Sequence, residues 1–173
     1  VREYVLTRMT RPRALPATMR ELNMEHALAR EALRLALHAP GSRLAGLHPV
    51  DVVLATGGVL ANAPHPALAA LILLDAIQPR GITSLVVDTA GLATMLGAIP
   101  GLSPRAAAEL SETDAVALLL GSVISTAGQP PPGELALRVV LEFADGRQQS
   151  QEIERGTLTR LLLAPNERAT LSL

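Results

Sequence analysis

The sequence predicts an α/β fold, in which a small parallel sheet with helices precedes a β-rich C-terminal region. The first indication is the strand–helix–strand pattern of residues 50–88, whose element lengths are typical of parallel strands joined by a crossover. The second is the change after Asp114, where short apolar runs alternate with turn residues. The third is the pair Gly57 and Gly58, which directly follows the first apolar run.

The composition excludes several kinds of site. The 173 residues carry a net charge of -1, with no Lys, no Trp, one Phe and one Tyr, so we expect no nucleic-acid partner. Without Cys there is no disulfide framework, thiolate metal site or thiol nucleophile. No apolar run reaches the roughly 18 residues that a membrane span needs, so we expect no membrane partner. With no Cys and no signal-peptide pattern, we expect a cytoplasmic location. Because the chain opens on Val1, we expect it to be part of a longer protein.

Three segments are expected along the chain. Residues 1–15 are basic and irregular, and predict a linker or a strand that belongs to an absent domain. Residues 16–113 contain the predicted α/β part, and residues 114–173 the β-rich region.

The clearest helix is expected over residues 16–39. Thr18 and Glu21 have the spacing of a capping box, apolar residues recur at helical intervals, and Pro40 follows the last turn. Glu25 is assigned to a polar face. His26 and His38 lie twelve residues apart and are expected to be surface or cap residues, not metal ligands.

The predicted parallel unit follows. Residues 50–55 form the first strand, residues 56–66 a turn, and residues 67–77 a helix that is apolar nearly all round and should be buried. Residues 82–88 form the second strand. Asp88 could face a ligand or cap a short helix over residues 90–96, and we favour the cap. A further short helix is expected over residues 104–110.

The β-rich region is expected to be mainly antiparallel. An apolar run over residues 135–143 meets Asp145 and Gly146, a hairpin signal, and a polar return strand over residues 147–153 should be an edge. Other short strands are expected over residues 116–124, 158–163 and 169–173, in a small sheet or partial barrel.

The glycine pair is the strongest candidate for a site. Glycine permits positive φ and close approach of the backbone, and ligands of open α/β sheets bind beyond the carboxyl ends of strands. Followed by a helix N-terminus, Gly57 and Gly58 could face a ribose or an adenine edge. The alternative is a simple tight turn. No phosphate loop, nucleophilic triad, carboxylate pair or metal site can be identified, so no catalytic residue is expected.

The sequence resembles the C-terminal part of the MutL-type accessory proteins encoded beside glutamate mutase (GlmL), which are unrelated to the mismatch-repair protein of that name. The resemblance covers most of the chain, including Gly156-Thr157-Leu158. It is carried by these blocks, in order: Arg11-Pro12-Arg13 to Pro16-Ala17-Thr18, Glu25-His26-Ala27-Leu28-Ala29-Arg30, Ala55-Thr56-Gly57-Gly58-Val59-Leu60, Leu73-Leu74-Asp75-Ala76-Ile77-Gln78-Pro79-Arg80-Gly81, Val87-Asp88 and Met95-Leu96-Gly97-Ala98.

This resemblance implies part of an actin-like ATPase lobe. Thr56, Gly57, Gly58 and Val59 would match the adenosine motif of that superfamily, and the phosphate motifs would lie upstream, in a lobe that partners this one. ATP is the implied cofactor of the full-length protein, and none is expected bound to this chain alone. The implied role is to assist or reactivate a cobalamin-dependent mutase, whose subunit would be a partner.

Two other functions stay open. The chain could be a non-catalytic interaction or oligomerisation module, with an apolar face that forms a homodimer. It could also be part of an actin-fold kinase or hydrolase whose catalytic residues lie upstream.

Overall fold

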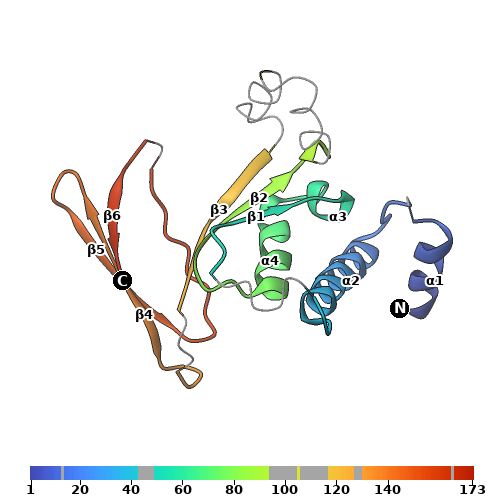
Figure 1. The fold of residues 1–173 in the computed structure, drawn as a ribbon, viewed down its shortest axis with the longest axis horizontal. Helices are drawn as coiled ribbons and strands as arrows, with labels where there is room; N and C mark the ends of the chain where they lie inside the picture. Colours follow the sequence, from blue (N-terminus) through green and yellow to red (C-terminus); the bar gives the residue numbers. More distant parts are fainter. Residues whose placement is uncertain (13, 43–48, 94–104, 106–116, 127–129, 165) are drawn as a thin grey trace. The chain divides into compact units, whose positions relative to one another are not determined.

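The computed structural model describes residues 1–12, 14–42, 49–93, 105, 117–126, 130–164 and 166–173. Contacts divide the chain into two compact units, Val1–Val123 and Ile124–Leu173, which are described separately (Figure 1). The elements are α1 Arg2–Thr10, α2 Met19–His38, β1 Val52–Ala55, α3 Gly58–Ala61, α4 Pro66–Ile77, β2 Gly81–Asp88, β3 Ala117–Ser125, β4 Leu135–Phe143, β5 Gln148–Glu154 and β6 Ala169–Ser172. Residues 90–92, where the first of two short helices is expected, are not helical. The rest of the helices expected over residues 90–96 and 104–110 lies outside the described residues, apart from residues 93 and 105.

The first sheet has the order β1–β2–β3. Strands β1 and β2 are parallel, with Val52 opposite Ser84 and Ala55 opposite Val87, which confirms the predicted pair of adjacent parallel strands. Strand β3 lies on the other side of β2 and runs in the opposite direction (Figure 1). The sheet is therefore mixed, whereas the sequence predicts a parallel sheet. Apolar periodicity carries no information on strand direction, which is why the sequence does not reveal this.

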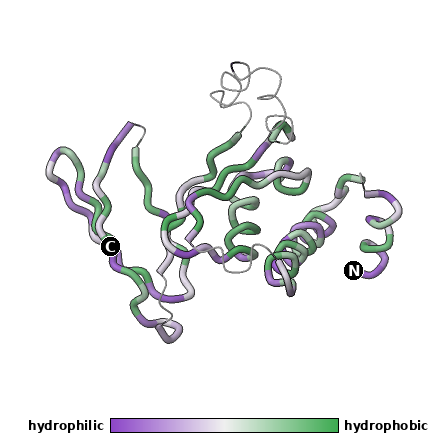
Figure 2. Tube along the Cα trace, viewed as in Figure 1, coloured by the Kyte–Doolittle hydropathy of each residue, from purple (hydrophilic) through white to green (hydrophobic). Residues whose placement is uncertain are grey.

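The core of the first unit lies between one face of the sheet and the helices. Its buried residues are Ala55, Leu60, Ala69, Ile72, Leu73, Leu85 and Val87. Helix α4 is hydrophobic along most of its length (Figure 2), and α2 packs against it. Helix α4 buries only one face, however, and Leu71 is 44% exposed, so the expectation of all-round burial is wrong.

The opposite face of the sheet is open in the described part of the chain. Val52 and Leu54 of β1 share this face with Ser84 and Val86 of β2, because strand residues alternate between faces. Val52 is 56% exposed and Leu54 is 54% exposed, and neighbouring Ile82 is also exposed. Parallel strands are normally covered on both faces, so this open apolar surface is unusual.

Helix α2 begins as the sequence predicts. The Thr18 hydroxyl accepts a hydrogen bond from the Glu21 N–H, as in a capping box. The reciprocal bond differs, because the Glu21 carboxylate accepts from the N–H of Ala17, one residue before the cap. Two N–H groups at this helix end are therefore satisfied by the predicted pair of residues.

Residues 2–10 form helix α1 instead of the irregular segment or strand expected there. No residue of α1 is buried. Charged and apolar residues are mixed around this helix, so it lacks the apolar periodicity by which helices are identified in a sequence.

The second unit is an antiparallel sheet with the order β5–β4–β6. The hairpin of β4 and β5 turns at Asp145 and Gly146, and β5 is an edge strand, as predicted. Val139, Leu141 and Phe143 form its core. Residues 158–163 are not a strand, although Leu161 packs on this core, and the sheet does not close into a barrel.

The sequence predicts that the β-rich region starts at residue 114. In the structure β3 pairs with β2, and the two compact units divide at residues 123 and 124. The expected domain limits 1–15, 16–113 and 114–173 themselves stay a prediction.

Candidate functional site

The glycine pair lies at the carboxyl end of β1. Gly57 has φ +107°, a conformation that residues with a Cβ rarely adopt, and no heavy atom lies within 4 Å of the position that a Cβ would occupy. Gly58 has no such φ, and a Cβ there would lie 3.7 Å from Asn62 Nδ2, an ordinary contact. Backbone conformation therefore requires glycine at position 57, and the space around both residues is open.

A short helix lies within the predicted turn after the glycines. Helix α3 has four residues, and α4 starts at Pro66, which confirms the helix predicted over residues 67–77. Gly57 O accepts from the N–H groups of Leu60, at 3.1 Å, and Ala61, at 2.9 Å. Those two N–H groups are therefore used inside the turn, and the expectation that the first N–H groups of this helix face a ligand stays a prediction. The backbone at Gly57 and Gly58 is exposed, so a flat group such as a base or a ribose can approach it.

Asp88 lies beside this turn, at the carboxyl end of β2. Asp88 is 1% exposed, and its carboxylate accepts hydrogen bonds from the N–H groups of Leu92, at 3.0 Å, and Ala93, at 2.8 Å. The bond from Ala93 is the main reason why the pKa of Asp88 is below its usual 3.8, although burial acts in the other direction. Asp88 thus holds the backbone that follows β2. An N-cap accepts from the second or third residue after it, whereas these bonds come from the fourth and fifth, so the favoured interpretation as the cap of a helix over residues 90–96 stays a prediction.

A cavity of about 380 Å³ lies beside Gly58. Its wall includes Gly58, Val59 and Asn62 from the turn, residues of α2, and the segment between α1 and α2. This volume is in the range of small-molecule sites, roughly 300–1,000 Å³. Of the four residues predicted from the sequence, Gly58 and Val59 line the cavity, whereas Thr56 and Gly57 do not.

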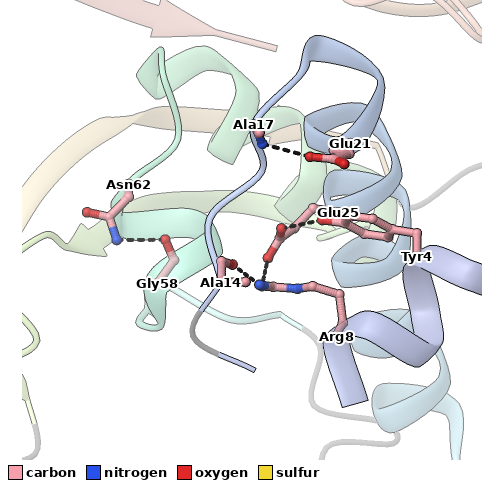
Figure 3. A network of polar contacts seen from close by, with 8 residues as sticks. All are labelled: Tyr4, Arg8, Ala14, Ala17, Glu21, Glu25, Gly58 and Asn62. Atoms are coloured by element: carbon pink, nitrogen blue, oxygen red, sulfur yellow. Dashed lines mark hydrogen bonds and ion pairs between the residues drawn. The ribbon is translucent and has the colours of Figure 1, made fainter. Parts of the chain in front are cut away.

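A buried carboxylate stands in the same wall. Glu25 of α2 is 8% exposed, which corrects its assignment to a polar face. It accepts a hydrogen bond of 2.7 Å from the Tyr4 hydroxyl and forms an ion pair with Arg8, which also donates to Ala14 O (Figure 3). Burial, and then this bond to Glu25, raise the pKa of Tyr4 to about 12. Tyr4, Arg8 and Glu25 are not among the site residues predicted from the sequence. The one sequence feature that marks this cluster is that Tyr4 is the single tyrosine of the chain.

His26 and His38 have separate surroundings in the described part of the chain. His26 lines the cavity, and its Nε2 is buried without a hydrogen-bond partner in the described part of the chain. His38 Nδ1 lies 2.8 Å from Arg34 O near the end of α2. Among the described residues, no group of three or more His, Cys, Asp or Glu side chains could hold a metal ion.

Fold and site together define an α/β domain with a glycine turn at the carboxyl edge of two parallel strands and a cavity beside that turn. The chain belongs to the MutL protein family, whose model matches residues 1–115. Neither the curated proteins nor the solved structures compared with the chain gave a match. In the described residues, no helix combines the length and hydropathy that crossing a bilayer requires.

Proposed function

We propose that this chain is the adenosine-side part of an ATP-binding accessory protein that assists a cobalamin-dependent mutase. Membership of the MutL family supports the general assignment, and the resemblance to the proteins encoded beside glutamate mutase supports the specific role. The observation that carries the proposal is the glycine turn at the carboxyl edge of β1, with the cavity next to Gly58.

In this proposal the glycine turn provides space for part of the ligand and has no catalytic role. Gly57 and Gly58 leave room for a ribose or a base close to the backbone, and in the proposal Thr56 and Val59 complete the contact. Arg8 is the cationic residue of the described cavity wall, and it is already paired with Glu25. Phosphate contacts and any hydrolysis are therefore assigned to the upstream lobe that the resemblance implies.

Titration with ATP tests this proposal. We expect weak binding by the 173-residue chain and tighter binding by a longer protein that includes the upstream lobe. Co-sedimentation of the longer protein with glutamate mutase subunits, with and without ATP, tests the partner. Absence of ATP binding to both proteins contradicts the nucleotide assignment, and absence of co-sedimentation contradicts the mutase assignment.

The open apolar face of the first sheet favours a second function, that of an interaction or oligomerisation module. Val52, Leu54 and Ile82 are each more than half exposed on strands that normally have both faces covered. An interaction through this face is compatible with a nucleotide at the glycine turn, since the turn lies at the edge of the sheet and not on its face.

A further inference from the structure

The segment between α1 and α2 forms one wall of the cavity beside Gly58. Arg8, Ala14 and Leu15 line the cavity from this side, and Gly58 and Val59 line it from the glycine turn. The cavity therefore has its present shape only while the N-terminal segment stays against α2.

Hydrophobic burial does not hold this segment in place. Helix α1 contains no buried residue. Its described side-chain bonds to α2 both end on Glu25: Tyr4 donates to Oε2 and Arg8 donates to Oε1 (Figure 3). Arg8 also donates to Ala14 O, so one guanidinium links Glu25 to the backbone of the cavity wall.

Loss of Glu25 should therefore release the whole segment. A buried carboxylate is stable only with partners, and the partners lose their acceptor when the carboxylate is removed. The contacts are charge-assisted, and such bonds are stronger than neutral ones. Other side chains of α1, such as Leu6 and Met9, are exposed and give little compensation.

The cavity wall also indicates which part of a nucleotide would fit. Leu15, Leu22 and Val59 give it an apolar surface, and its charged pair, Arg8 and Glu25, is mutually neutralised. A phosphate would find no uncommitted cation in the described wall, whereas an uncharged heterocycle with its sugar would bury apolar surface there. The cavity is thus suited to the nucleoside moiety.

We propose that Glu25 is a positioning residue that clamps the N-terminal segment as a wall of a nucleoside pocket, with Arg8 and Tyr4 as the clamped groups. This inference rests on the proposed nucleotide function and names the part of the ligand that the cavity receives. Because the cavity exists with the clamp closed, the closed arrangement is the binding-competent one, and opening it lowers the apparent affinity.

The test uses the 173-residue chain, with adenosine and tripolyphosphate as separate probes, titrated by NMR. We expect Glu25→Gln to weaken adenosine binding about tenfold, the change expected when a hydrogen bond to a charged group is lost. Tripolyphosphate binding should not change. Glu31→Gln is the matched control, because it breaks an exposed ion pair with Arg34 on the same helix, away from the cavity.

Two further variants separate positioning from general stability. Arg8→Glu combined with Glu25→Arg restores an ion pair of reversed polarity and should recover most of the adenosine affinity. Tyr4→Phe removes one of the two α1 contacts and should have a smaller effect. Hydrogen exchange should show that Glu25→Gln exposes the hydrogen-bonded amides of α1, residues 5–11, while those of β2 stay protected.

The outcomes distinguish the two proposals. If adenosine binds the wild type and Glu25→Gln equally well, the clamp is wrong and the nucleotide function stands. If Glu25→Gln unfolds β2 as well, or the charge reversal recovers nothing, the role of Glu25 is general stability and the clamp is overturned. If neither adenosine nor ATP binds the chain or the longer protein, the proposed function fails, and the clamp fails with it.

Discussion

The Thr56 hydroxyl donates a hydrogen bond of 3.3 Å to the Asp88 carboxylate, and this bond joins the carboxyl ends of the two parallel strands. Ala55 and Val87, the residues directly before them, are register partners. Thr56 belongs to the predicted adenosine motif, and Asp88 holds the backbone at Leu92 and Ala93. The glycine turn is thus connected to the loop after β2 through one buried carboxylate.

We predict that Asp88→Asn reduces the acid dependence of stability. The pKa of Asp88 is lowered in the folded protein, so its contribution to stability is fully present above its unfolded pKa, near 3.8, and is lost as the pH falls through the lower folded value. Circular dichroism during acid titration measures this. Asp51→Asn is the control, since Asp51 is an exposed residue at the opposite end of β1. Identical acid limbs for wild type and Asp88→Asn would contradict the prediction.

We predict that substitution by alanine destabilises the folded chain at Gly57 and is tolerated at Gly58. Gly57→Ala should lower the free energy of unfolding by about 1–3 kcal/mol, because φ +107° is strained for alanine. Gly58→Ala should be tolerated, since its Cβ would make only an ordinary contact with Asn62. Thermal unfolding measures both changes.

The larger substitution Gly58→Val addresses the site. It should weaken ATP binding by the longer protein while the sheet still folds, because its side chain occupies space beside the cavity. Gly58→Ala serves as the control for backbone effects. ATP binding by Gly58→Val that is as tight as in the wild type would mean that the glycines form only a turn.

We predict that Tyr4 ionises about two pH units above an ordinary tyrosine. Its pKa is raised from 10.0 to about 12, so its contribution to stability is complete below pH 10 and is lost as the pH rises through 12. The chain has one Tyr and no Trp, so tyrosinate absorbance reports Tyr4 alone. Glu25→Gln should return the midpoint towards 10. A midpoint near 10 in the folded wild type would show that the contact with Glu25 is absent in solution.

We predict that the chain self-associates through the open face of the first sheet. Leu54→Glu should shift the equilibrium to the monomer, because it places a charge in the centre of the apolar surface. Leu162→Glu, which changes an exposed leucine in the second unit, is the control. Sedimentation equilibrium decides the question, and a monomeric wild type at high micromolar concentration is the contrary result.

Interactions between residues that are close in the sequence determine much of this structure. The cap of α2 needs only Thr18 and Glu21, three residues apart, and the hairpin needs only Asp145 and Gly146 between two extended runs. The parallel pair of β1 and β2 follows from element lengths within residues 50–88. Such features depend on neighbours within a few residues, so they can be recognised from sequence patterns.

Tertiary structure alone decided the features that depend on distant partners. Glu25 is buried because Tyr4, 21 positions away, and Arg8, 17 positions away, approach it, and Asp88 meets Thr56 across 32 positions. The direction of β3 and the open face of the sheet likewise depend on which elements pack together. A carboxylate on a helix carries no local sign of its partners, because its pairing arises only when the folded chain brings remote charges to the same place.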